Sequence, residues 1–380
     1  MRFSLFPLPG RSACLSDTAL LCTVCTVCGI IRGMLDWLTA RVGYDASALK
    51  LGEVLAVNPG GEIVWRKERP VVVRGSYESS VLVGRGSSTS DMRESAERSG
   101  FLVSSDSLWI SGNPVKFLQG HNVFGPPASS LGSLIRSVIR KLPDGVKPPD
   151  ADSELWASMH ASRCDLNVMV DLERHASVHE WLRDVGSISR TRHGRPLVSG
   201  ATVTWGKGSR RWSLVAYCKF CELAAHPFAD VGINERLREF VEGQVRLEVR
   251  LHGLELKGRG VPDESWLWEY FERVEIGGLE MESLKAGRPA LRPVVELCFG
   301  EWMSGKDVGC VLPRRTFYKY RREIIESTGI DISIPRCEQE LAVEKAHFDV
   351  EYLRQHEVKS IPEGLQQFLF RPDKCPAYSF

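Results

Sequence analysis

The sequence predicts an α+β protein, with an antiparallel sheet core, flanking helices and a smaller helix-containing C-terminal region. Several short runs alternate apolar and polar side chains between turns rich in glycine and proline, which is typical of strands. Other segments have apolar residues at helical spacing. The chain has 380 residues, of which 43% are hydrophobic and 26% charged. A chain of this size can bury one large core or two modest ones.

The charge of the chain limits where a nucleic acid could bind. The formal net charge is only +1, whereas strong nucleic-acid binders often carry a clear basic excess. Any surface that binds DNA must therefore be local. The composition also excludes a disordered or fibrous chain.

The first residues lack the periodicity of the rest. Residues 22–28 (CTVCTVC) have the cysteine gaps of a metal knuckle, but no second pair of Cys or His follows at zinc-site spacing. The apolar stretch 19–31 faintly resembles a secretory signal, although threonines and a glycine interrupt it. A well-patterned protein begins at Met34. We interpret residues 1–33 as a non-native or disordered extension from an upstream start codon.

Residues 34–145 predict the N-terminal part of the main domain. Segments 52–57, 62–65 and 71–73 are expected to form strands of an antiparallel meander, separated by turns at Pro59 and Pro70. Residues 108–125 predict two strands around Gly112-Asn113-Pro114, with His121 just past the second. Residues 129–142 have the apolar spacing of a helix.

Residues 146–275 predict the sheet region that carries the chemistry. In the strand 165–171, Asp165, Asn167, Met169 and Asp171 share one face because side chains alternate along a strand. Asp165 and Asp171 would lie roughly 20 Å apart at 3.3 Å per residue. One metal ion cannot bind both, and Asp165 is the better candidate.

A hairpin is predicted from strands 202–205 and 212–219. Its turn is basic, and we expect Lys207, Arg210 and Arg211 to contact DNA, with Trp212 beside them as a base-stacking platform. On the second strand, Tyr217 and Lys219 share a face. A lysine beside a tyrosine can lower the cost of a phenolate or hold a phosphate.

The strand 245–252 alternates without a fault, and Glu248 and His252 share its polar face. If these strands are neighbours in one sheet, Asp165, Glu248 and a histidine could converge opposite Tyr217. Such oxygen-rich ligation suits Mg²⁺ or Mn²⁺ better than zinc. The alternative is that these residues have no role in catalysis. Tyr217 would then only pack in the sheet, and the charged face of the strand 245–252 would be solvated and form cross-strand ion pairs.

Residues 276–380 predict a C-terminal region with a basic helix over 313–328. This helix is either a duplex-binding helix or a charged surface helix. Tyr318 and Tyr320 are rival nucleophiles, but at 100° per residue they lie roughly 200° apart on the helix and do not form a pair. The basic side chains of the helix are Arg314, Arg315, Lys319, Arg321 and Arg322.

Four blocks in a fixed order carry a resemblance to a known family. They are 111–125 (SGNPVKFLQGHNVFG), 163–172 (RCDLNVMVDL), 217–226 (YCKFCELAAH) and 246–251 (RLEVRL). From about Trp37 to Ile334 the chain resembles the gene II and gene X replication proteins of filamentous phages, and more distantly the tyrosine initiators of rolling-circle plasmids. The resemblance implies a nickase that opens and rejoins one strand of circular duplex DNA through a tyrosine–phosphate intermediate.

The resemblance also assigns roles to residues. Tyr217 would be the nucleophile with Lys219 beside it, and Asp165, Glu248 and His226 would hold Mg²⁺ or Mn²⁺. The further candidates are His121, Glu222 and His252. No His-hydrophobic-His motif is present, so the ligand set stays open. We interpret the Cys218-x-x-Cys221 spacing as chance rather than a redox motif.

Partners and alternatives follow from the same resemblance. The implied partners are the double-stranded circular phage DNA, single-stranded DNA at the origin, and host proteins such as a helicase and a polymerase, in the cytoplasm of a bacterial host and without a membrane. Two other classes stay open. One is a non-catalytic origin-binding regulator, and the other is a metal-dependent nuclease that uses activated water.

Overall fold

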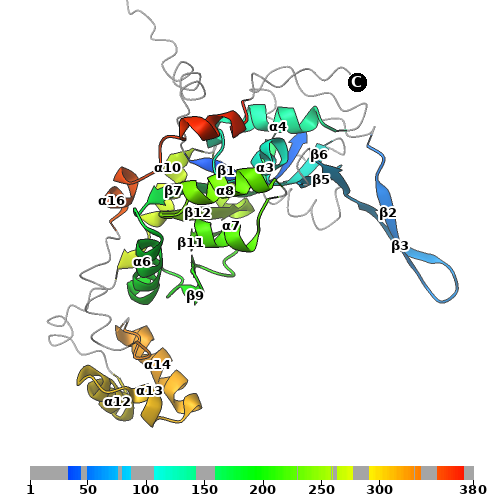
Figure 1. Cartoon of the computed structure of the whole chain (residues 1–380). Coiled ribbons are helices and arrows are strands. Elements are labelled where there is room, and N and C mark those ends of the chain that lie inside the picture. Colours follow the sequence, from blue (N-terminus) through cyan, green and yellow to red (C-terminus); the bar gives the residue numbers. More distant parts are fainter. Residues whose placement is uncertain are drawn as a thin grey trace, which may run out of the picture.

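The structure is a computed structural model of the chain (Figure 1). It describes residues 33–43, 49–75, 79–86, 107–142, 159–276 without 229, 258 and 260–262, then 291–334 without 329, and 349–371. The expected N-terminal extension, including its cysteines, lies outside the described residues. No helix in the described part of the chain is both long and apolar enough to cross a membrane.

A nine-stranded antiparallel sheet forms the centre of the described residues, in the order β4-β5-β6-β1-β7-β12-β11-β10-β9. This confirms the predicted α+β class. The strands are β1 (Met34–Gly43), β4 (Val71–Arg74), β5 (Ser80–Arg85), β6 (Ser107–Gly112), β7 (Met159–Asp171), β9 (Leu197–Ser199), β10 (Thr202–Trp205), β11 (Trp212–Cys218) and β12 (Gln244–His252). Strands β8 (Ser189–Arg190) and β13 (Glu275–Ile276) form a separate short pair.

The two faces of the sheet are covered differently. On β7, Leu166, Val168 and Val170 join the main core, to which helices α6 (His175–Ile188) and α10 (Glu264–Phe271) contribute. The side chain of Met169 points to the opposite face of β7. It joins a second core with residues of α7 (Lys219–Ala225) and α8 (Val231–Phe240). The alternation predicted for this strand is confirmed. A short helix α9 (Gly253–Leu256) follows β12.

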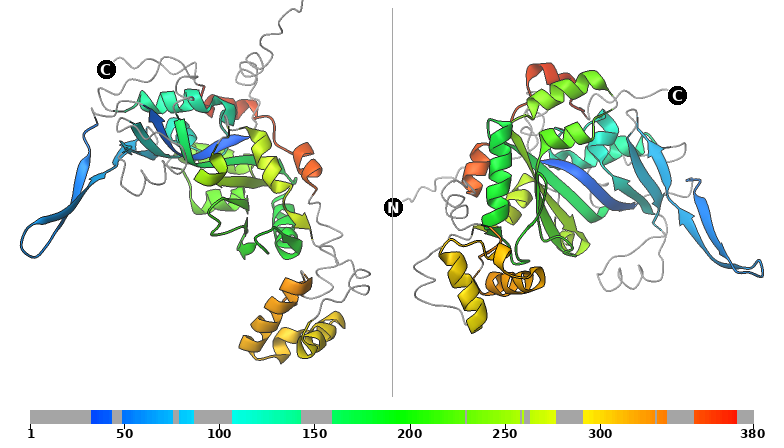
Figure 2. Two further views of the ribbon diagram at one scale, coloured as in Figure 1. Left: turned by 180° about the vertical axis from the view of Figure 1, so that it is seen from behind. Right: turned by 60° about the horizontal axis from the view of Figure 1, so that its bottom comes forward.

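The predicted meander is only partly correct. Strands β2 (Gly52–Val57) and β3 (Ile63–Arg69) pair with each other as a hairpin that extends from the body (Figures 1 and 2). The following strand, β4, instead pairs with β5 in the main sheet. Pro70 separates β3 from β4, and a proline has no N–H with which to continue a strand ladder.

The second strand predicted within 108–125 is wrong, because a helix takes its place. Helix α3 (Pro114–Gln119) begins after Asn113, whose side-chain oxygen accepts a hydrogen bond from the Lys116 backbone N–H at 2.7 Å. Proline in the first turn and Gly120 at the C-cap, with φ 89°, complete the helix signals. The 3-10 turn η1 (Ala128–Ser130) and the predicted helix, α4 (Leu131–Ile139), follow.

The C-terminal region divides into two parts. Helices α12 (Pro293–Met303), α13 (Val308–Val311) and α14 (Arg314–Thr328) share a small core of their own. The tail returns to the main domain instead: Leu353 of α16 (Val350–Gln355) joins the main core, and Leu365 of η2 (Glu363–Phe368) joins the second core. Residues 349–371 therefore pack with the main domain rather than with the C-terminal helices.

Candidate functional site

The strands that carry the predicted site are neighbours, because β12 lies between β7 and β11. The three strands are therefore neighbours in one sheet, as a shared site of Asp165, Tyr217 and Glu248 requires. Residues directly opposite each other across strands have neighbouring side chains on the same face of a sheet. The cross-strand pairs on the polar face are Arg246–Tyr217, Glu248–Asn167 and Arg250–Asp165.

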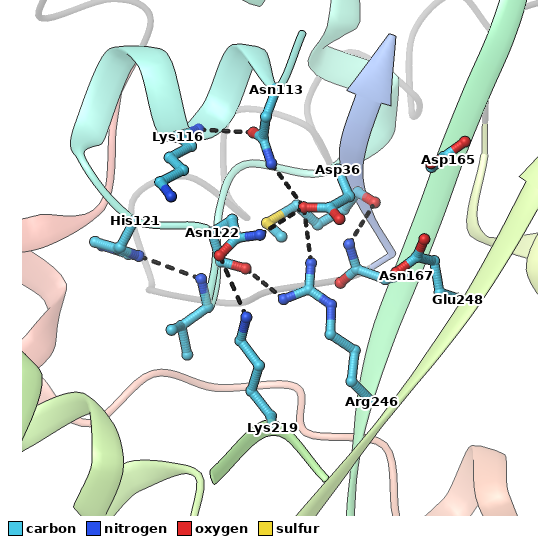
Figure 3. A network of polar contacts seen from close by, with 12 residues as sticks. Asp36, Asn113, Lys116, His121, Asn122, Asp165, Asn167, Lys219, Arg246 and Glu248 are labelled. Atoms are coloured by element: carbon cyan, nitrogen blue, oxygen red, sulfur yellow. Dashed lines mark hydrogen bonds and ion pairs between the residues drawn. The ribbon is translucent and has the colours of Figure 1, made fainter. Parts of the chain in front are cut away.

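Asp36 joins this face from the next strand. The register of β1 against β7 shifts between Leu35 and Trp37, so Asp36 is the extra residue of a bulge, a feature that can re-aim a side chain. Its Oδ1 accepts hydrogen bonds from Asn113 Nδ2 at 2.7 Å and Asn122 Nδ2 at 2.9 Å (Figure 3). The bulge thus turns a carboxylate toward the α3 end of the network.

Arg246 lies at the centre of the network and is fully buried. Its Nη2 lies 3.0 Å from Asp36 Oδ1, and its Nη1 donates to the backbone carbonyl of Asn122 (Figure 3). Its Nε has no hydrogen-bond partner among the described residues. Burial alone would raise the pKa of Asp36, but Arg246 and Lys219 bring it below its ordinary value.

Tyr217 is half-buried on β11, beside Arg246. Burial raises the pKa of Tyr217 well above its ordinary value, Arg246 opposes this, and Glu248 and Asp36 add to it. The tyrosine is therefore a neutral phenol in the free protein. Its proton must be removed, or its charge stabilised by a ligand, before it can attack.

The sequence analysis placed Lys219 in the strand of Tyr217. This is wrong, because Lys219 is the first residue of α7. It is fully buried, and its Nζ donates to Glu222 Oε2 at 2.7 Å and Asn122 Oδ1 at 3.3 Å. Burial and then Arg246 lower the pKa of Lys219 to about 8. A lysine with this pKa can exchange a proton near neutral pH.

Two more carboxylates lie on the same face. The side chains of Asp165 and Glu248 are buried, and burial and Asp36 raise the pKa of both. Arg163 Nη2 pairs with Asp165 Oδ2 at 2.5 Å, and Arg250 Nε pairs with Glu248 Oε1 at 2.6 Å. Buried carboxylates that repel one another are a common setting for a divalent cation, and Mg²⁺ commonly needs only one or two of them together with phosphate oxygens and water.

The three candidate histidines differ in their burial and in their neighbours. His226 is exposed at the end of α7. His121 is fully buried, which lowers its pKa to about 4, and its Nε2 lies 3.2 Å from the Phe368 carbonyl. Burial, then Arg163 and Arg250, lower the pKa of His252. Within the described residues, one group of three or more His, Cys, Asp or Glu has all ligand atoms within 4.8 Å, and it contains neither the three histidines nor the carboxylates above.

The basic side chains of the turn between β10 and β11 are exposed, as a surface that binds DNA requires, but the tryptophan beside them is not. Lys207, Arg210 and Arg211 are exposed, and Arg211 Nη1 also lies 3.4 Å from Glu255 Oε2. Trp212 is fully buried against Tyr270, with ring centroids 5.3 Å apart. The prediction that Trp212 stacks on a base is therefore wrong.

The basic residues of α14 have different surroundings. Arg321 makes two hydrogen bonds to Asp331, both 2.6 Å long, and so stabilises the small core. Arg314 lies with its guanidinium 5.9 Å from the Tyr318 ring. The α14 basic face, which we define as Arg315, Lys319 and Arg322, is exposed. These three side chains point within about 60° of one another on the helix.

The sequence interpretation missed Asp36, Asn113 and Asn122 as members of the site. Both asparagines belong to the block 111–125. We expected Asn113 in a turn between two strands and gave Asn122, which follows the second of them, no role. Asp36 stands out in hindsight as a carboxylate in the otherwise largely apolar start of the patterned chain.

The fold and the site define a class: an α+β protein whose antiparallel sheet gathers arginine, lysine, tyrosine and carboxylate groups on one face. Residues 34–269 match the N-terminal family model of the phage replication-associated proteins. The chain belongs to this family, and is thus a phage replication-associated protein.

Two phage proteins support the assignment. The chain is 30% identical over 319 residues to the replication-associated protein of Enterobacteria phage I2-2, covering 79% of this chain and 88% of that protein. It is 32% identical over 176 residues to the replication-associated protein of Enterobacteria phage fd, covering 40% and 41%. A rolling circle replication initiator protein from Geobacillus stearothermophilus aligns with a TM-score of 0.30 at 12% identity, over 69% of this chain and 93% of that one.

Proposed function

We propose that this chain initiates rolling-circle replication by nicking and rejoining one strand of a circular phage DNA through Tyr217. The observation that carries the proposal is the cross-strand pair of Tyr217 and the buried Arg246. A buried arginine held by Asp36 beside a tyrosine can stabilise the negative charge that develops on a phosphate diester as the tyrosine attacks it.

The reaction balances as a transesterification. Tyr217 Oη forms a bond to the phosphorus, the bond from phosphorus to the 3′ oxygen breaks, and the proton of the phenol ends on the 3′ hydroxyl that leaves. The protein keeps the 5′ phosphate, and attack by a 3′ hydroxyl reverses the step without ATP. Lys219 shares the neighbours Arg246, Asp36 and Glu222 with Tyr217, and we assign it the movement of this proton.

Asp165 and Glu248 fit a divalent cation, because both carboxylates are buried and Asp165 is close enough to raise the pKa of Glu248. His226, which is exposed at the end of α7, is not assigned to this ion. Bound Mg²⁺ or Mn²⁺ would neutralise non-bridging phosphate oxygens. Arg163 and Arg250, which pair with Asp165 and Glu248, would hold these two carboxylates in place until DNA binds.

The DNA itself would meet two basic surfaces. Lys207 and Arg210 lie exposed in the turn that leads into β11, the strand of Tyr217. The α14 basic face would bind the duplex through its phosphates. Host helicase and polymerase would act on the nicked circle, in the bacterial cytoplasm.

The test is nicking of a supercoiled circle that carries the cognate phage origin, with Mg²⁺ or Mn²⁺, followed by a denaturing gel. The wild type should give a nicked circle with protein attached. Tyr217→Phe should abolish both products, whereas Tyr318→Phe, which removes the exposed rival hydroxyl on α14, should leave them unchanged. Binding without nicking would indicate a regulator, and nicking without an adduct would indicate hydrolysis by water.

A further inference from the structure

Four potential metal ligands meet outside the network described above. They are His175, His179, Cys218 and Cys221, and their ligand atoms all lie within 4.8 Å of one another. His175 and His179 are one turn apart on α6, so they share a helix face. Cys218 ends β11 and Cys221 lies in the first turn of α7.

The distances within this group leave room for one central ion. Cys221 Sγ lies 3.2 Å from His175 Nε2 and 3.2 Å from His179 Nε2, and the two nitrogens are 3.1 Å apart. Three polar atoms in such a triangle cannot all form straight hydrogen bonds with one another. Tetrahedral zinc, with bonds of about 2.0 to 2.3 Å, would place its nitrogen and sulfur ligands roughly 3.3 to 3.8 Å apart. A small outward movement of these three ligands would reach those spacings, and Cys218 Sγ, which lies within 4.8 Å of them, would be the fourth ligand.

We propose that His175, His179, Cys218 and Cys221 form a structural zinc site. Two thiolates and two imidazoles are a ligand set that zinc prefers, and the Cys-x-x-Cys spacing is that of a zinc knuckle. The spacing that we interpreted as chance from the sequence thus gains its two missing ligands from a distant helix. All four positions of the ion would be filled by the protein, so the zinc holds structure and performs no chemistry.

The surroundings fit a closed site. Cys218 is fully buried, and its Sγ already accepts the Cys221 backbone N–H at 3.4 Å. The ring of Phe220 packs against His175 with centroids 4.8 Å apart, and Arg238 lies 4.9 Å above that ring. These side chains limit the access of water to one side of the ligands.

The zinc would fasten α6 to the junction of β11 and α7. Cys218 lies between Tyr217 and Lys219 in the chain, so the ion would fix the point at which the strand of the tyrosine becomes the helix of the lysine. The zinc site can be tested separately from the proposed function, because binding of the ion would require neither Tyr217 nor DNA.

The test is the zinc content of the purified full chain, measured by elemental analysis. One zinc per chain is expected in the wild type, in Tyr217→Phe and in the control Cys310→Ser, which changes an exposed cysteine outside the group. Cys221→Ser and His179→Ala should lose the zinc, whereas His179→Cys should keep it because four ligands remain. Reconstitution with Co²⁺ should give thiolate-to-cobalt charge-transfer bands that Cys221→Ser lacks.

Three results would overturn the proposal. They are a wild type that holds no zinc after reconstitution, a zinc content unchanged in both Cys221→Ser and His179→Ala, and loss of the zinc when Cys22, Cys25 and Cys28 are replaced by serine. The last result would assign the ion to the N-terminal cysteines. A protein that fails to nick DNA but retains its zinc would contradict the proposed function alone.

Discussion

The ion pair between Asp36 and Arg246 gives the sharpest test of the network. Arg246 is fully buried and the Asp36 side chain is only 16% exposed. Removing one partner of a buried pair costs roughly 3 to 5 kcal/mol, because the other charge is left in the interior. Asp36→Ala also leaves Asn113 and Asn122 without an acceptor. We expect it to lower the free energy of unfolding by about 3 kcal/mol, toward the lower end because the carboxylate is not completely buried.

A double-mutant cycle separates the pair from its surroundings. Replacing both partners by apolar residues of similar size, as in Asp36→Leu with Arg246→Met, should cost much less than the sum of the single changes. The measurement is urea unfolding at pH 7, followed by circular dichroism and tryptophan fluorescence. A coupling of about 2 kcal/mol or more is expected, and single losses that add to within about 0.5 kcal/mol would refute the reasoning.

The same pair predicts a dependence on pH. The folded pKa of Asp36 lies below its ordinary value of 3.8. The stability that it contributes is therefore present above that pH and is lost as the pH falls through the folded pKa. Asp36→Ala should remove this part of the acid sensitivity. An unfolding curve of Asp36→Ala with the same acid dependence as the wild type would count against the assignment.

Three further predictions concern the rest of the site. Burial raises the pKa of Glu248, so the charge of its carboxylate opposes folding at neutral pH. Glu248→Gln should therefore raise Tm, while the rate of nicking falls at least about a hundredfold. A lowered Tm together with a normal rate of nicking would contradict this. Lys219 has a pKa of about 8 against an ordinary 10.5, so the unfolded chain binds more protons between these values. The stability of the wild type relative to Lys219→Met should rise by roughly 3 kcal/mol over that range, and a difference that does not vary with pH would exclude the shift. Replacing the α14 basic face with alanine should weaken duplex binding for all sequences and reduce the salt slope by about 0.9 per lost phosphate contact. Lys306→Ala, which removes an exposed lysine paired with Glu301, should leave the slope unchanged.

The limits of sequence reasoning are clear at the start of two helices. Asn113-Pro114 is interpreted as part of a turn, yet Asn113 caps α3 and Pro114 is its first residue, because turns and helix starts use the same residue types. Likewise, the alternation of β11 was extended by one residue too many, to Lys219. A period of two does not show where a strand ends, and Cys218 caps the helix that follows.

The sequence by itself determined which side chains share a face. The alternation along β7 and β12 separates Asp165 and Glu248 from the apolar residues of the same strands, because side chains of a strand point to opposite faces in turn. The order of the four blocks also identified the family, which the comparisons then confirmed.

Only the tertiary structure decided which faces meet. Asp36 reaches Arg246 through a bulge in a strand far away in the chain, and His175 reaches Cys221 by the packing of α6 beside β11. It also buried Trp212, which we expected beside the basic turn as a base-stacking platform. Local patterns depend on neighbours within a few residues, whereas these contacts depend on strand order and on the depth of the core, which arise from pairings between distant segments of the chain.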